Sequence, residues 1–163
     1  MKNKFAKRVI NYGLLIVMVA MMVDQSVKAQ ALTYGLRANI PFAFSVGNTQ
    51  LPAGKYSVSR ALPNSGDGLI AINSLGGKAS ALRTTIPVTT GQPRDKATLV
   101  FHRYGDQYFL YQIWPVAGTT GRQFLTSSSE REIKRRLEAD AAAAGKVGKN
   151  TQPETVTIDG GLQ

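Results

Sequence analysis

The residues that most often carry out chemistry in proteins are sparse in this chain. It contains one histidine, His102, and no cysteine, which leaves little material for a metal site and none for thiol chemistry. His102 lies within a run of aromatic and β-branched residues, and this setting favours a core or half-buried histidine over a metal ligand. We therefore expect no metal site and no cofactor.

Acidic residues are equally scarce. Residues 30–127 contain only Asp67, Asp95 and Asp106, and no glutamate. Each aspartate lies in a predicted turn, where its side chain is explained by turn stabilisation. A glycosidase with two carboxylates would need a pair of acids across a cleft, and no serine lies in the G-x-S-x-G pattern that a hydrolase with His102 would use. We expect no catalytic residue, and an enzyme of unknown type stays as an alternative.

Recognition is the chemistry for which the chain offers candidates. Two β-rich runs within residues 97–114 flank Gly105-Asp106, a pair suited to a two-residue hairpin turn. The turn predicts that Arg103 faces Tyr108, and strict alternation then places Trp114 on the same face. Aromatic rings beside a guanidinium can bind a glycan or a peptide. Arg103, Tyr108 and Trp114 are thus a candidate ligand face, and the alternative is that the rings fill a core.

Turn residues recur every eight to twelve positions through the same region, which indicates an all-β fold. We predict an antiparallel β-sandwich, jelly-roll-like or a small barrel, over residues 30–127. One C-terminal α-helix is expected over residues 128–145, beginning with a capping box of Ser129 and Glu132. Residues 146–163 are predicted to be a disordered tail.

The first 29 residues have the pattern of a secretory signal peptide. Four basic residues precede an apolar run at positions 9–23, and small residues lead to a cleavage site between Ala29 and Gln30. As a helix this run would rise about 22 Å, less than the roughly 30 Å of a hydrocarbon core. We expect cleavage, no membrane span after it, and a periplasmic or extracellular protein.

The charge of the predicted mature chain is unevenly distributed. Residues 30–127 hold nine Lys or Arg and three Asp, a net charge of +6, whereas residues 128–163 hold six basic and six acidic residues. A basic exported domain attracts anionic polymers, lipid headgroups or glycans of the cell envelope. Nucleic acid is not expected, because the basic residues form no stripe and the chain is exported. The sequence sets no oligomeric state.

Two segments carry a resemblance. Residues 40–56 contain PFAFSVG followed by LPAGKY, and residues 99–110 read LVFHRYGDQYFL. Together they resemble a group of short exported bacterial proteins of unknown function that combine a signal peptide, a compact β domain and a C-terminal helix. The resemblance covers roughly residues 34–137. It implies export and a β fold, and it carries over no functional residue.

These observations favour a non-catalytic, envelope-associated protein with a binding or structural role that uses its basic β domain. The second hypothesis is a subunit of a protein assembly, which would dock through an edge strand at Pro41 or through the C-terminal helix.

Overall fold

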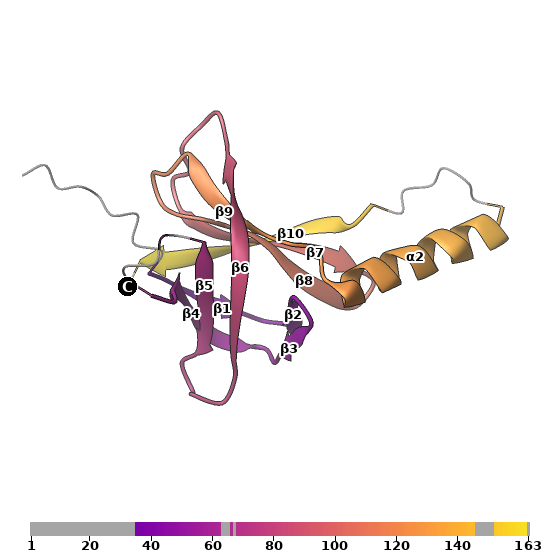
Figure 1. Ribbon diagram of the computed structural model, residues 1–163, viewed down its shortest axis with the longest axis horizontal. Helices are drawn as coiled ribbons and strands as arrows, with labels where there is room; N and C mark the ends of the chain where they lie inside the picture. Colours follow the sequence, from indigo (N-terminus) through magenta and orange to yellow (C-terminus); the bar gives the residue numbers. More distant parts are fainter. Residues whose placement is uncertain (1–34, 63–65, 67, 146–151, 163) are drawn as a thin grey trace, which may run out of the picture. The chain divides into compact units, whose positions relative to one another are not determined.

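The computed structural model describes residues 35–62, 66, 68–145 and 152–162. All the described residues belong to one compact unit, and the predicted signal peptide with its Ala29–Gln30 cleavage site lies outside them. Over the described residues the fold is all-β with one α-helix towards the C-terminus (Figure 1), as the sequence predicted. The strands are β1 (Leu36–Ile40), β2 (Phe44–Val46), β3 (Thr49–Leu51), β4 (Gly54–Arg60), β5 (Leu69–Ser74), β6 (Ser80–Thr89), β7 (Ala97–Tyr104), β8 (Gln107–Trp114), β9 (Thr120–Phe124) and β10 (Glu154–Leu162), and the helix is α2 (Ser128–Ala143).

Eight of these strands close into an antiparallel barrel. Around the barrel the order is β8-β7-β10-β1-β4-β5-β6-β9, and β9 pairs back onto β8. β2 and β3 form a small hairpin outside this ring, attached to β8 by a parallel contact between Ser45 and Phe109. Closure removes the exposed edges that an open sheet would carry. β1, which ends just before Pro41, pairs with β4 along its whole length, whereas its ladder with β10 covers only Leu36 and Arg37. The end of β1 next to Pro41 therefore has β4 as its one ladder partner among the described strands, and docking at this edge stays a prediction. Of the described strands, β3 has a single neighbour.

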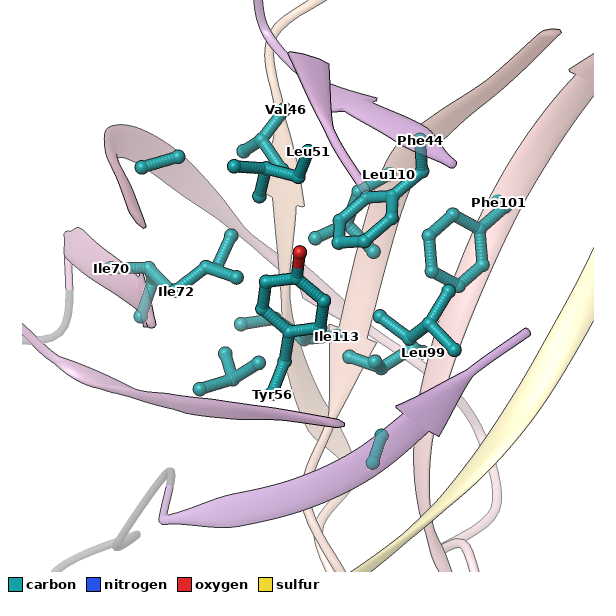
Figure 2. Close-up of a cluster of buried hydrophobic side chains, with 14 of the residues drawn as sticks. Phe44, Val46, Leu51, Tyr56, Ile70, Ile72, Leu99, Phe101, Leu110 and Ile113 are labelled. Carbon is teal, nitrogen blue, oxygen red and sulfur yellow. The ribbon is translucent and has the colours of Figure 1, made fainter. Parts of the chain in front are cut away.

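The barrel interior is a core of aliphatic and aromatic side chains. Figure 2 shows the Tyr56 ring among residues of several strands, and Tyr56 is fully buried. Its ring meets Phe44 edge to face at 5.1 Å, and its hydroxyl donates to the Pro52 carbonyl at 2.7 Å. Phe101 packs edge to face on Phe44 from the other side, at 5.5 Å. Such edge-to-face pairs favour a specific arrangement of the rings in addition to their burial.

The β7–β8 hairpin confirms the predicted turn and the register beside it. Arg103 pairs with Tyr108 and His102 with Phe109, while Gly105 has a φ of 60°. Beyond these pairs the register shifts, because Phe101 pairs with Leu110 but Val100 pairs with Gln112. The skipped residue, Tyr111, forms a β-bulge. The bulge reverses the alternation of β8 that we predicted and turns the side chain of Ile113 into the core (Figure 2).

The predicted disordered tail of residues 146–163 is wrong where the structure describes it. Residues 154–162 form β10, which lies between β7 and β1 and completes the barrel. Val156 and Ile158 pack against the core from this strand, and Lys96 binds Asp159 at 3.0 Å. The β domain is therefore not continuous in sequence: residues 30–127 lack the strand that closes it.

The helix begins at Ser128, as predicted, but its N-cap lies two residues before the predicted one. Ser127 is the N-cap, and its hydroxyl accepts from the Glu130 backbone N–H at 3.0 Å. Ser129 instead donates its hydroxyl to the side chain of Asn48 at 3.2 Å, and Glu132 pairs with Arg136 at 3.5 Å. The predicted box of Ser129 and Glu132 is therefore wrong. The choice of cap follows from the side chain of Glu130, which is buried against the barrel.

Candidate functional site

Two of the three residues of the predicted ligand face lie together at the turn end of β7 and β8. The guanidinium of Arg103 lies 5.5 Å from the centre of the Tyr108 ring. Arg103 also donates to the Gly105 carbonyl at 2.8 Å and pairs with Glu154 of β10 at 3.2 Å. The Tyr108 ring also stacks on Phe42 at 3.8 Å. The ring and two of the five guanidinium N–H donors are thus already engaged within the protein.

Trp114 does not belong to this face. It is six residues further along β8, a distance of about 20 Å at the rise of a strand, and it pairs with Thr98. Only 4% of Trp114 is exposed; the Arg94 guanidinium lies 4.7 Å from the centre of its ring, and its indole N–H donates to Gln112 at 3.1 Å. The structure therefore brings Arg103 and Tyr108 together and buries Trp114 elsewhere.

His102 takes part in a cluster that attaches the helix to the barrel. Its Nδ1 lies 2.8 Å from Oε1 of Glu130, and its ring stacks on Tyr111 at 3.8 Å. The hydroxyl of Tyr104 donates to the same carboxylate oxygen at 3.4 Å. Burial, together with the charge and the hydrogen bond of Glu130, raises the pKa of Tyr104 to about 12.

This cluster gives His102 a structural task. The sequence placed His102 in a half-buried strand position, and its side chain is 18% exposed. Glu130 is the only residue of α2 that is buried, so its bonds to His102 and Tyr104 supply much of the contact between the helix and the barrel. Sequence analysis missed the pair because Glu130 appeared to be a surface residue of an amphipathic helix.

A different surface is open and positively charged. On the outside of β1 and β4, Arg37, Asn39, Lys55 and Leu75 line a shallow groove of about 360 Å³ together with Ala38. Arg37 pairs with Ser57 across the two strands, and Asn39 pairs with Lys55. Side chains alternate along a strand, so Arg37, Asn39, Lys55 and Ser57 all belong to the outer face. We call these four residues and Leu75 the basic groove.

The neighbouring strand leaves the basic groove uncovered. Arg37 pairs on its other side with Gly161 of β10, which has no side chain, and a Cβ placed there would meet no atom within 4 Å. On the far side, the turn after β5 lies beside Lys55, whose carbonyl accepts from the Leu75 N–H at 2.9 Å. The same turn carries Lys78, which is exposed.

The charges of the groove are not neutralised within the described part of the chain. Arg37 and Lys55 are exposed, and neither forms an ion pair with a described residue. Other cations of the barrel are engaged: Lys96 binds Asp159, Arg103 binds Glu154, and the buried Arg122 donates to Thr85. Two of the cations that make up the positive excess of the sequence are therefore available at the basic groove.

A smaller pocket of about 200 Å³ also contains a cation. It lies between the β2–β3 hairpin and strands β6 and β9, and Arg83 forms part of its wall. That guanidinium donates to the Thr49 hydroxyl at 2.7 Å and to the Leu82 carbonyl at 2.8 Å. These bonds make Arg83 a brace between the hairpin and β6, so the pocket offers a ligand less free charge than the basic groove.

In comparisons with known proteins, no family model, no curated protein and no solved structure matches the chain. Within residues 35–62, 66, 68–145 and 152–162, no three His, Asp or Glu side chains are grouped so that they could hold a metal ion. In the same residues there is no helix of the length and hydropathy needed to cross a membrane.

Proposed function

We propose that this is an exported, non-catalytic protein of the cell envelope that holds an anionic polymer on the outer surface of its barrel. The observation that carries the proposal is the basic groove, where Arg37 and Lys55 are exposed on adjacent strands without an acidic partner among the described residues. The signal-peptide pattern and the resemblance to exported proteins favour the envelope as the place where that polymer is met.

The spacing of the two cations suits a chain of charges better than a single small anion. Arg37 faces Ser57, and Lys55 lies two residues from Ser57 along β4, so the two basic residues are diagonal neighbours about 7–8 Å apart. Two charges at that separation can each bind a different anionic group of a polymer. Exposed charges of this kind attract polyanions over long range and lose strength in salt.

The remaining residues of the groove suit a saccharide backbone. The Asn39 amide can donate to and accept from sugar hydroxyl groups. The Ser57 hydroxyl, which donates to the Asn73 carbonyl at 3.4 Å, can accept from them. Leu75 adds apolar surface at the end of the groove and is 48% exposed. We therefore favour a polymer that carries carboxylate or phosphate groups on a saccharide or polyol chain.

The test is co-sedimentation of purified residues 30–163 with isolated envelope material at increasing salt. We expect binding at low salt that falls steeply towards about 500 mM, because the Debye length shrinks to a few ångströms. The variant Arg37→Gln/Lys55→Gln should lose most of the binding. The matched control is Arg131→Gln/Arg135→Gln, which removes the same charge from the exposed part of α2.

Two defined probes, alginate and polyphosphate, then separate carboxylate from phosphate recognition. The groove variant should weaken binding to the preferred probe at least tenfold, since two charge-assisted contacts are lost. Equal loss in the groove variant and the helix control would show that only net charge matters. Absence of binding to the envelope and to both probes would refute the proposed function.

A further inference from the structure

The helix α2 is anchored at its first turn and open beyond it. Ser127, Ser129 and Glu130 supply the bonds to the rest of the chain described above, whereas from Arg131 to Ala144 no residue is buried. Most of the stability of a helix in a protein comes from the packing of its apolar face. α2 has 16 residues, and beyond its first turn it has little of that packing within the described part of the chain.

The two halves of α2 differ in charge. The first half holds three basic residues and the acidic residues Glu130 and Glu132, and the second half holds Arg136, Glu138 and Asp140. Glu130 suits the positive N-terminal end of the helix dipole, whereas the last turn has no basic residue to suit the negative end. A second helix that runs in the opposite direction would bring basic residues of one copy beside Glu138 and Asp140 of the other.

We propose that α2 is a self-association element that pairs antiparallel with α2 of a second copy of this chain. The apolar stripe of Ile133, Leu137 and Ala141 recurs every four residues and lies on one side of the helix. Leu137 is 38% exposed. A two-fold axis at Leu137 places Ile133 at the height of Ala141 of the second copy and leaves Leu137 facing its own equivalent.

The same axis pairs opposite charges on both sides of the stripe. At 100° per residue, Lys134 and Glu138 lie along one side of the stripe, and Arg136 and Asp140 lie along the other. The two-fold axis keeps equivalent sides together. Lys134 then lies beside Glu138 of the second copy and Arg136 beside Asp140 of the second copy, each offset by about 3 Å along the helix.

The ion pairs within a single helix leave room for this arrangement. Lys134 lies 4.0 Å from Glu138 and Arg136 lies 3.5 Å from Glu132, and all four side chains are exposed, so both ion pairs within one helix are weak. Asp140 has no ion-pair partner among the described residues. Ala141 and Ala144 are small, which lets two helices approach closely along the acidic half. The apolar stripe, the charges beside it and the small residues of α2 are thus all suited to α2 of a second copy.

Association through one helix pair is expected to be weak, because the interface is smaller than the roughly 1,200–2,000 Å² of stable complexes. Sedimentation velocity of residues 30–163 should therefore be measured from about 10 µM to about 1 mM. We expect a monomer–dimer equilibrium within this range. A monomer at every concentration would overturn the proposal.

Adjacent substitutions on opposite sides of α2 supply the specific test. Arg136→Glu should raise the dimer dissociation constant about tenfold, because the two-fold axis applies each change twice. Arg135→Glu carries the same charge change on the far side of the helix and should change it less than about twofold. Equal effects of the two variants would contradict the antiparallel register.

Rescue distinguishes pairing from loss of helix structure. Asp140→Lys alone should also weaken the dimer, and a mixture of Arg136→Glu with Asp140→Lys should form a mixed dimer more readily than either variant pairs with itself. Leu137→Gln keeps a helix-forming residue and should abolish dimers while the circular dichroism spectrum of the barrel is retained. A mixture that stays monomeric would overturn the register, and the groove variant Arg37→Gln/Lys55→Gln should dimerise normally.

Discussion

Removal of β10 should destroy the barrel, although the strand is encoded by the last residues of the chain. Seven residues of β10 are in register with β7 and two with β1. If each register position contributes about one hydrogen bond worth roughly 0.5–1.5 kcal/mol, the strand supplies about 5–13 kcal/mol. That range is comparable to the whole free energy of unfolding of a typical domain, about 5–15 kcal/mol.

The assay is urea unfolding of residues 30–163, followed by Trp114 fluorescence and by circular dichroism. A chain that ends at Gln152 should show no cooperative transition, because the core between β1 and β7 would face water. A truncated chain with the unfolding midpoint of the intact chain would refute the placement of β10. Point variants give a graded form of the same test.

Ile158→Ala removes a partly buried side chain that packs on the core and should cost about 1–2 kcal/mol, below the range for full burial. Its neighbour Thr157 is exposed, and Thr157→Ala should change the stability by less than about 0.5 kcal/mol. Equal effects of the two substitutions would show that Ile158 does not contact the core.

Three further predictions concern the barrel and the helix anchor. Gly121→Ala should destabilise the protein by about 1–3 kcal/mol, because a Cβ there would lie 2.6 Å from the Trp114 ring and 2.8 Å from the Ile113 carbonyl oxygen. The control is Gly91→Ala, because a Cβ at Gly91 meets no atom within 4 Å. Equal urea midpoints of the two variants would contradict this packing. Glu130→Ala should lower the free energy of unfolding by about 2–3 kcal/mol, since it leaves His102 and Tyr104 without their partner. Glu132→Ala, at an exposed position, should lower it by less than about 0.5 kcal/mol. Similar losses for the two variants in urea unfolding would refute the role of Glu130 in attaching the helix to the barrel. Because the pKa of Tyr104 is raised to about 12, the unfolded chain loses this proton at lower pH than the folded chain. The free energy of unfolding should therefore fall as the pH rises from about 10 to 12. In urea unfolding at several pH values, Tyr104→Phe should reduce that fall, and an unchanged dependence on pH would contradict the prediction.

Local signals predicted the parts of the fold whose partners are near in sequence. Gly105 is followed at once by the second strand of its hairpin, so the turn fixed the pairs next to it, including Arg103 with Tyr108. The bulge at Tyr111 could not be predicted from the sequence, because both faces of β8 carry apolar residues and the hydrophobic pattern does not reveal where the alternation changes. The position of Trp114 relative to Arg103 and Tyr108 could not be predicted without it.

Partners distant in the sequence explain the other differences. The β-branched run of residues 155–158 alternates with the period of a strand, and that signal was outweighed by the polar, glycine-containing residues around it. Its strand identity depends on β7 and β1, which are far away in the chain. Three consecutive serines stand at the start of the helix, and Ser127 becomes the N-cap because that start directs Glu130 towards His102.

The basic groove also depends on residues that are distant in the sequence. The excess of positive charge in residues 30–127 was visible in the composition. That Arg37 and Lys55 share one surface follows only from the register of β1 and β4, and that Arg37 is uncovered follows from Gly161 of the unpredicted strand β10. The anionic partner expected from the sequence stays a prediction, and the sequence pointed to a different face for binding it.

The most direct test of anion binding at the basic groove is a nuclear magnetic resonance titration of residues 30–163 with a short alginate oligosaccharide and with polyphosphate. Our account predicts that the largest amide shift changes occur at Arg37, Asn39 and Lys55 and in the turn at residues 75–78, and that they diminish at high salt. Shift changes concentrated around Arg103 and Tyr108, spread evenly over all basic residues, or absent with both probes would contradict it.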